Sequence, residues 1–325
     1  MQILITGITG RIGANIAAAL VKKGHQVKGL VWPRDPRISK LKTLGITLIE
    51  GSLTEQKDVE KTVKDSEIIY HLGAAFQGGG PFTNEEYFDI NVKGTFYMLE
   101  AAKKNKSLKQ FIFASSDALY DKYLPQGMQN PIKEDEMPRK PAGWYPLSKS
   151  IGEEMCNSYI FEDNLPITIL RFAKVEGAGE IIDFPQFYLS TFKDDSNLKH
   201  LWKGEEKLII LRTKDGHSFK KHIAEVRDIT DGCLSAFNNS KSFGETFQLA
   251  GPKPFSWENT IPYLSKKLNL PFVEGTPEGA PTFYEFDISK SKNILGFNPK
   301  YDIKEMIDEA LKFKSGKSSN ILPTD

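Results

Sequence analysis

Short apolar runs, rich in β-branched and aromatic residues, recur along the first half of the chain. They occupy residues 2–6, 26–31, 47–51, 67–73, 110–116 and 167–172. Helix-compatible stretches separate most of these runs, including residues 13–23, 91–104 and 145–161. Strands that alternate with helices predict an α/β fold with a doubly wound parallel sheet.

The second of these stretches shows most clearly why a helix is expected. Its apolar residues recur at helical spacing, at Val92, Phe96, Leu99 and Ala102. Such spacing places them on one face of a helix, where they pack against the core or against a partner.

The regular alternation ends near residue 172, which divides the chain into two predicted parts. Residues 1–172, with a returning segment near 222–250, form the predicted dinucleotide-binding domain. Residues 173–221 and 251–325 form a smaller and less regular lobe, which we expect to bind the substrate. Two later apolar runs predict strands, at 207–213 and 245–250.

Composition excludes several classes of partner. The 325 residues contain 43 Lys plus Arg and 42 Asp plus Glu, and a formal charge of +1 provides no field that would attract nucleic acid or an anionic membrane. The two cysteines, Cys156 and Cys233, match no metal or redox spacing. No apolar run approaches the roughly 18 residues of a membrane span, and no secretory leader is evident, so we expect a cytoplasmic protein.

A glycine-rich turn follows the first predicted strand and opens the first predicted helix. Gly7 permits a tight turn, Gly10 leaves room for a pyrophosphate, and Gly13 lets the helix approach the strand. The alternative is an ordinary strand-to-helix turn, but the position directly after the first strand favours a dinucleotide. The expected cofactor-binding residues here are Gly7, Thr9, Gly10, Arg11, Ile12 and Gly13.

The end of the second predicted strand bears on which dinucleotide binds. An NAD site usually has an acidic residue there for the ribose hydroxyls, but this strand ends in Val31 and Trp32. Arg34 and Arg37 follow, and guanidinium groups pair with a 2′-phosphate. This pattern favours NADP over NAD, although Asp35 offers a carboxylate to a ribose. The ends of two further strands add Ser52, Leu53, Leu72, Gly73, Ala74 and Ala75 to the expected cofactor site.

Two Tyr-Lys pairs have the spacing needed for proton transfer to a carbinol oxygen. They are Tyr145/Lys149 and Tyr263/Lys267, and in each pair the i,i+4 spacing places both side chains on one helical face. Tyr145 opens the helix after the fifth strand, close to the serine at that strand's end, whereas Tyr263 lies within a helix of the second lobe. We therefore expect Tyr145, Lys149 and Ser116 to be catalytic, with Ser116 preferred over Ser115.

These motifs together resemble the extended short-chain dehydrogenase/reductase family, also called the NAD-dependent epimerase/dehydratase family. The resemblance rests on "TGITGRIG", "NVKGTFYMLEAA", "SSDALY" with "YPLSK", and "DISKSKNILGFNP". It implies a Rossmann-type sheet, catalysis by Ser116, Tyr145 and Lys149, and contacts of Asn91 and Lys149 with the cofactor site. In this family, helices equivalent to those near Asn91 and Tyr145 often form a homodimer.

The chain also departs from the family pattern. Asp117 is followed by Ala118 rather than Glu, which disfavours dehydration. Where relatives hold a nucleotide diphosphate with Asn and two Arg, this chain has Lys174, Lys221 and Pro277, so nucleoside diphosphates should bind poorly. Lys220, Lys221, His217 and His222 form either a replacement anion site or a solvated basic loop. Residues 76–82 form either a substrate loop or a linker. The expected substrate-binding residues are Gln77, Ser116, Asp117, Lys174 and Lys221.

The sequence thus predicts an NAD(P)-dependent oxidoreductase that transfers hydride at a secondary alcohol or ketone of a sugar-like substrate. A nucleotide-sugar 4-epimerase with tightly bound NAD would use the same catalytic residues and stays open as an alternative. A non-catalytic NAD(P)-binding regulator is a third interpretation, which the intact Ser-Tyr-Lys set disfavours.

Overall fold

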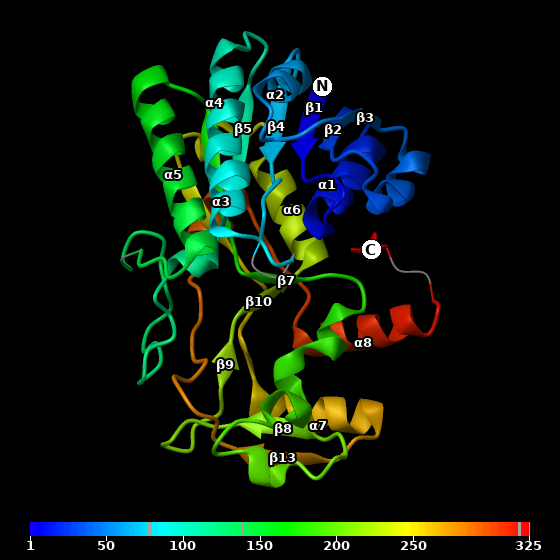
Figure 1. Ribbon diagram of the computed structural model, residues 1–325, viewed down its shortest axis with the longest axis vertical. Coiled ribbons are helices and arrows are strands. Elements are labelled where there is room, and N and C mark those ends of the chain that lie inside the picture. The colour runs from blue at the N-terminus through cyan, green and yellow to red at the C-terminus, as the bar shows by residue number, and fades with distance from the viewer. Residues whose placement is uncertain (77–79, 138, 318–319, 325) are drawn as a thin grey trace.

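A seven-stranded parallel sheet forms the centre of the computed structural model, which describes residues 1–325 except 77–79, 138, 318–319 and 325 (Figure 1). In spatial order, the strands are β11 (Thr246–Leu249), β6 (Ile167–Phe172), β5 (Gln110–Ser116), β4 (Ile68–His71), β1 (Gln2–Thr6), β2 (Gln26–Val31) and β3 (Thr47–Glu50). Every neighbouring pair is parallel. This confirms the doubly wound sheet predicted from the alternating runs.

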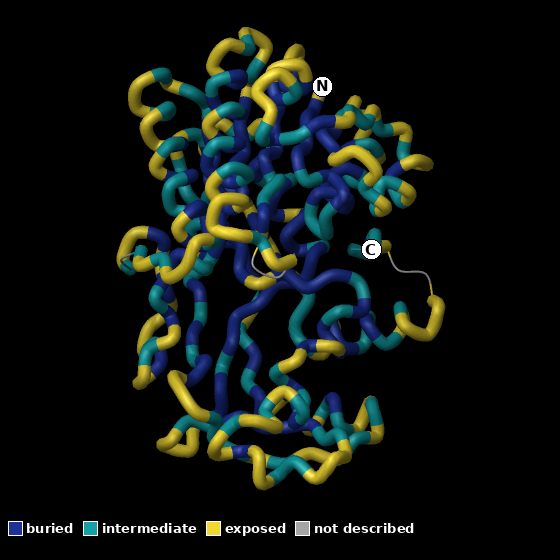
Figure 2. The backbone as a smooth tube through the Cα atoms, viewed as in Figure 1, coloured by how far each residue is buried: buried dark blue, intermediate teal, exposed yellow. Residues whose placement is uncertain are grey.

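Helices cover both faces of the sheet because alternate strand residues point to opposite sides. Ile3 and Ile5 of β1 belong to one buried cluster, whereas Leu4 belongs to another. The first cluster includes residues of α1 (Arg11–Lys22) and α6 (Val226–Ala236). The second includes residues of α2 (Gln56–Val63), α4 (Gly94–Lys104) and α5 (Trp144–Asp163). The central strands β4, β5 and β6 are buried throughout between these layers, whereas the edge strand β3 is partly exposed (Figure 2).

The helix expected over 91–104 is longer and less regular than its apolar spacing indicates. It begins with α3 (Asn84–Tyr87) and a π-helical turn, η2 (Phe88–Lys93), before α4. Leu99 and Ala102 are buried as expected, but the Phe96 side chain is exposed. One residue of the apolar pattern, Phe96, is therefore exposed to solvent in the single chain.

A second lobe lies beyond the carboxyl ends of the strands (Figure 1). Its core surrounds Trp257, which is fully buried and lies within 6.4 Å, between ring centroids, of Phe184, Phe187, Phe219 and Phe255. Its helices are α7 (Trp257–Leu268) and α8 (Ile303–Lys314). Its strand pairs are β8 (Leu208–Leu211) with β13 (Phe272–Gly275) and β9 (Lys220–Lys221) with β12 (Phe255–Ser256).

The two lobes are joined by several chain crossings. β7 (Lys174–Glu176) pairs in parallel with β10 (Ile223–Glu225), and the chain then returns through α6 to add β11 to the main sheet. Short helical segments occupy the connections: η1 (Pro36–Leu44), η3 (Asp117–Leu119), η4 (Glu180–Asp183), η5 (Pro185–Phe187), η6 (Leu189–Phe192), η7 (Lys199–Leu201), η8 (Ser240–Ser242) and η9 (Ser291–Leu295). None of the described helices is both long and apolar enough to cross a bilayer.

The end of the chain returns from α8 to the first helix of the sheet domain (Figure 1). The Asn15 side chain donates to the Leu322 carbonyl oxygen at 3.1 Å and accepts from the Leu322 N–H at 2.9 Å. Lys40 Nζ donates to the Pro323 carbonyl oxygen at 2.8 Å. Leu322 and Pro323 are therefore docked, through their backbone groups, against α1 and η1.

Candidate functional site

The glycine turn between β1 and α1 has no room for side chains. Gly7 has a φ of +69°, and a Cβ there would lie 2.8 Å from the Gly73 nitrogen. A Cβ on Gly13 would lie 2.3 Å from the Gly7 carbonyl oxygen. Gly10 is the N-cap of α1 and supplies no side-chain cap, so free N–H groups of the first turn face the turn region. This geometry fits a dinucleotide pyrophosphate.

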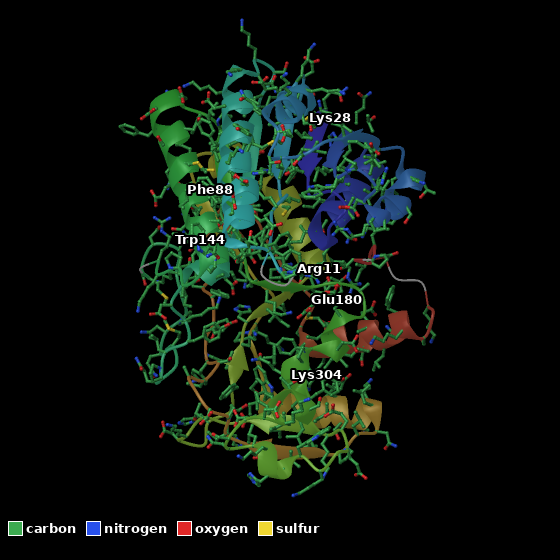
Figure 3. All side chains as sticks on the ribbon, in the orientation of Figure 1. Arg11, Lys28, Phe88, Trp144, Glu180 and Lys304 are labelled. Atoms are coloured by element: carbon green, nitrogen blue, oxygen red, sulfur yellow. The ribbon has the colours of Figure 1, made fainter. Side chains whose placement is uncertain are left out.

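Two of the other three predicted residues of this turn, Arg11 and Ile12, have side chains directed elsewhere. The Arg11 guanidinium forms a 2.7 Å ion pair with Glu180 and donates to the Val175 carbonyl oxygen at 3.0 Å, where the two lobes join (Figure 3). Ile12 packs against the buried cluster beneath α1. Both residues therefore offer only backbone groups to a bound cofactor.

Asp35, in the loop after β2, is the carboxylate that the sequence offers to a ribose as the alternative to an NADP site. Its carboxylate accepts from Thr9 Oγ1 at 2.8 Å, which links the loop after β2 to the glycine turn. Arg37 donates to both carboxylate oxygens, from Nε at 2.9 Å and from Nη2 at 2.8 Å. The hydrogen bonds from Arg37 lower the pKa of Asp35 to about 2. Of the two guanidinium groups on which the NADP prediction rests, Arg34 and Arg37, that of Arg37 is thus paired with a carboxylate.

The remaining predicted cofactor residues meet at the carboxyl edge of the sheet, as parallel strands require. Asn91 joins this edge to α5: its amide accepts from the Ala75 N–H at 2.7 Å and donates to the Ser148 hydroxyl at 2.9 Å. The Gly73 N–H donates to Thr6 Oγ1 at 3.0 Å. The neighbouring residues at this edge are Ser52, Leu53, Leu72 and Ala74.

Sequence reasoning missed a buried polar chain beneath this edge. His71 Nδ1 lies 2.8 Å from Thr6 Oγ1, and its Nε2 lies 2.9 Å from Thr95 Oγ1. Burial, and secondarily the charge of Lys149, lowers the pKa of His71 to about 3. A neutral histidine therefore bridges β1, β4 and α4, and no spacing along the chain would have linked these three residues.

Ser116, Tyr145 and Lys149 are assembled by β5 and α5. Ser116 ends β5, and its hydroxyl accepts from the Ala118 N–H at 3.1 Å. Burial raises the pKa of Tyr145 to about 12, and a hydrogen bond with Ser116 opposes that rise. Lys149 Nζ donates to the Ala114 carbonyl oxygen at 2.8 Å, and burial lowers its pKa to about 8. Ser116 and Tyr145 thus contact each other. Lys149 is held close by through its hydrogen bond to β5, the strand that carries Ser116.

Ser115 and the Tyr263/Lys267 pair, which the sequence offers as alternatives to Ser116 and to Tyr145/Lys149, are bonded elsewhere. The Ser115 hydroxyl donates to the buried Glu153 carboxylate, so it faces away from Ser116. The Tyr263 hydroxyl lies 2.8 Å from both carboxylate oxygens of Asp308, and Lys267 pairs with the same carboxylate at 2.6 Å. Tyr263 and Lys267 therefore connect α7 to α8, far along the chain from the sheet edge.

The predicted substrate residues differ in how they are paired. Asp117 forms a 2.6 Å ion pair with Lys122, whose side chain is buried. Lys174 pairs with Glu176 and lies 5.0 Å from the Phe184 ring centroid. Gln77 lies outside the described residues.

Lys221 is the exception among the basic groups of this region. It is buried, its Nζ lies 4.9 Å from the Phe184 ring centroid, and it donates to Gln186 Oε1 at 3.2 Å. Within the part of the chain that the structure describes, it forms no ion pair. Burial lowers its pKa to about 8.

The other members of the basic loop do not join Lys221. Lys220 forms a 3.3 Å ion pair with Glu285, and His217 is exposed. His222 is buried, with Nε2 2.9 Å from the Gly251 carbonyl oxygen and Nδ1 accepting from the Phe286 N–H at 3.1 Å. Of the four candidates, only Lys221 is therefore placed as an anion ligand would require.

Comparison with known proteins agrees with this geometry. The sequence model of the NAD dependent epimerase/dehydratase family matches residues 3–250. The chain belongs to this family. The resemblance seen in its motifs is confirmed, and the protein is an enzyme of the short-chain dehydrogenase/reductase type. Membership of the epimerase/dehydratase family argues against the non-catalytic regulator.

Relatives within the epimerase/dehydratase family span nearly the whole chain. UDP-glucuronate 4-epimerase 1 of Arabidopsis thaliana is 28% identical over 333 residues, covering 94% of this chain and 74% of the relative. An uncharacterized UDP-glucose epimerase of Bacillus subtilis is 26% identical, covering 97% and 98%.

Solved structures show the same fold. A short-chain dehydrogenase/reductase superfamily protein of Agrobacterium tumefaciens with bound NAD is 28% identical with a TM-score of 0.85, covering 97% of this chain and 98% of that one. UDP-glucuronic acid 4-epimerase of Bacillus cereus in complex with NAD, at 22% identity and a TM-score of 0.73, covers 98% and 100%. These neighbours were solved with NAD, and nothing in the comparisons supports the preference for NADP.

We expect Tyr145→Phe to reduce turnover by roughly 10² to 10⁴, because it removes the hydroxyl that transfers the proton. Cofactor affinity should stay nearly unchanged, since the ring and helix remain. Steady-state kinetics and fluorescence titration with cofactor measure the two effects. Tyr263→Phe is the matched control and should leave turnover intact. Loss of activity in the control, with activity retained in Tyr145→Phe, would show that the site is misassigned.

Proposed function

We propose that the protein is an NAD-dependent 4-epimerase of a nucleotide-linked sugar. The observation that carries the proposal is the meeting of Ser116 and Tyr145, with Lys149 beside them, at the sheet edge that the glycine turn also faces. Several relatives named as UDP-glucuronate 4-epimerases support this choice over net dehydrogenation. Bound NAD would accept a hydride from the substrate carbon and return it.

The residues of the site have separate tasks in this reaction. Ser116 holds the substrate oxygen by a hydrogen bond, and ionised Tyr145 takes its proton as the carbon loses hydride. In the return step, Tyr145 gives the proton back while hydride reaches the opposite face of the carbonyl carbon. The configuration at that carbon is inverted, and no net oxidation occurs.

The ionisation of Tyr145 requires support from other groups in the site. At about 1.36 kcal/mol per unit, bringing a phenol with a pKa of about 12 to neutral pH takes about 7 kcal/mol. A lysine ammonium about 4 Å away, at an effective dielectric constant of about 20, supplies about 4 kcal/mol. Lys149, which lies one helical turn after Tyr145 on α5, is the cation we assign to this task, and the Ser116 hydrogen bond and the bound reactants contribute the rest.

Lys221 supports an anionic substrate. A buried ammonium that lacks a counter-ion is costly, and Lys221 has three N–H donors but, among the described residues, one acceptor, on Gln186. Lys174 approaches the same Phe184 ring and adds a second positive charge. A phosphate of a nucleotide-linked sugar would complete the bonding of Lys221.

A second candidate is net oxidation or reduction of a sugar that carries no nucleotide. It is favoured by Lys174, Lys221 and Pro277, which stand where the family holds a nucleotide diphosphate with Asn and two Arg. Under this alternative, nucleoside diphosphates bind poorly, as the sequence predicts. Calorimetry with UDP, GDP and dTDP separates the two candidates.

We expect the protein, supplied with NAD and UDP-glucuronate or UDP-glucose, to form the C4 epimer without accumulating reduced cofactor. Proton NMR of the sugar and absorbance of the reduced nicotinamide follow the two products. Lys221→Gln should raise KM at least about tenfold with little change in kcat, since it removes substrate binding rather than chemistry. Lys220→Gln, which alters a neighbouring but paired lysine, should behave like wild type. Accumulating reduced cofactor without epimer would favour the second candidate.

We infer that NAD is the natural cofactor. Asp35 stays ionised and holds Arg37, so the guanidinium is neutralised and a carboxylate faces the site where a 2′-phosphate would lie. Like charges disfavour that phosphate. The Agrobacterium neighbour with bound NAD supports the same choice.

Fluorescence titration should therefore show tighter binding of NAD(H) than of NADP(H). Asp35→Ala removes the repelling carboxylate and releases Arg37, so we expect the ratio of the two affinities to shift at least about tenfold toward NADP(H). Arg34→Ala should change the ratio much less. Preference of the wild-type protein for NADP(H) would contradict the inference and restore the sequence-based prediction.

We also propose that the protein is a homodimer that uses α4 and α5. These helices pack against each other and expose large apolar side chains at Phe96, Trp144, Leu147 and Phe161, and Phe88 of the preceding η2 is exposed as well. Phe88 and Trp144 both lie on the α3–α5 side of the molecule (Figure 3). Exposed apolar groups gathered on neighbouring helices are typical of an interface.

Light scattering at micromolar concentration should give the mass of a dimer. Phe96→Glu places a charge in the proposed interface and should yield monomers. Phe272→Glu is the control, because Phe272 is similarly exposed, at 41% against 44%, but lies on β13 of the second lobe. A wild-type monomer, or equal dissociation by both variants, would exclude this interface.

A further inference from the structure

A buried ion pair lies directly behind the catalytic residues and is not explained by substrate or cofactor binding. Glu153 and Arg171 have side chains only 1% and 7% exposed, and their paired atoms lie 2.7 and 2.8 Å apart. Arg171 also donates to the Tyr120 hydroxyl at 2.7 Å and to the Glu134 carbonyl oxygen at 2.9 Å. The guanidinium is therefore almost fully bonded and cannot move to serve another partner.

The Glu153 carboxylate connects this pair to the catalytic strand and helix. It accepts from the Ser115 hydroxyl, next to Ser116 on β5, and it lies one helical turn after Lys149 on α5. It also accepts from Arg139 Nη1 at 3.2 Å. All the acceptor positions of the carboxylate are thus filled by groups that fix it between β5, β6 and α5.

Because Lys149 is buried, whether it stays protonated depends on the charges of the groups around it. The titratable groups near this ammonium are Glu153 and Cys156 from α5 and His71 from β4. His71 is neutral, and burial raises the pKa of the Cys156 thiol, so neither carries charge near neutral pH. Glu153 is therefore the carboxylate, among the described residues, whose charge stabilises the protonated lysine.

We propose that Glu153 is a positioning residue for catalysis, which fixes the end of β5 through Ser115 and keeps the neighbouring Lys149 charged. Arg171 holds the Glu153 carboxylate in place and offsets part of its negative charge. The more exposed Arg139 offsets a smaller part of the same charge. The network thus acts on the Ser-Tyr-Lys set without touching a reactant. The proposal rests on the catalytic roles given above, but its test does not require a known substrate.

The test is an NMR titration of Lys149 in protein labelled with 13C at the lysine ε-carbon, with the Lys149→Arg variant identifying the signal. Glu153→Gln removes the stabilising charge and should lower the midpoint of Lys149 by about one pH unit. Arg139→Gln removes an opposing charge and should raise the midpoint by a smaller amount. Glu154→Gln, an exposed neighbour on the same helix, should leave it unchanged.

A purely structural role would not shift the midpoint in opposite directions in two variants that weaken the same network. A folded Glu153→Gln protein with an unchanged Lys149 midpoint would overturn the proposal. If Glu153→Gln does not fold, an unchanged midpoint in Arg139→Gln overturns it instead. Where a substrate is turned over, the alkaline limb of the pH–rate profile should move in the same direction as each midpoint. Failure to turn over any nucleotide sugar would count against the proposed function alone.

Discussion

The close approach of the glycine turn to its neighbours is the constraint on which the rest of the site depends. Gly7 packs against the backbone of Gly73, and Gly13 packs against Gly7, with no space for a methyl group at either contact. These contacts hold the start of α1 against the ends of β1 and β4. Because all seven strands are parallel, the cofactor turn, Asp35 and the end of β5 then meet at one edge. Distances that matter for hydride transfer are set by this backbone packing.

The sequence was sufficient for features that depend on local pattern. Each of the six apolar runs became a strand of the main sheet, and the glycines, Ser116, Tyr145 and Lys149 lie where their flanking elements indicated. Partners distant in sequence could not be predicted. The bond from Thr9 to Asp35, and that from Thr6 to His71, join residues whose proximity only the sheet order creates.

Basic residues show this limit most clearly. Arg37, Lys220 and Lys221 look alike in the sequence, but the first two are paired with carboxylates and the third is buried beside a neutral amide. A count of charged residues in the sequence cannot distinguish a cation that is paired with a carboxylate from one that has no counter-ion among the described residues. The serines of β5 illustrate a simpler rule, because adjacent strand residues face opposite sides. Ser115 faces the internal ion pair, and Ser116 is left to face the reactants.

The return of the chain to the main sheet has a consequence for synthesis on the ribosome. β11, the edge strand beside β6, is made only after part of the second lobe, and the segment that docks on Asn15 and Lys40 is made later still. The nascent sheet domain therefore stays without one edge, and without the docked segment, until these later parts of the chain have been made. During that interval β6 exposes unpaired backbone groups, and a chain that stalls late in synthesis presents an open edge to other strands.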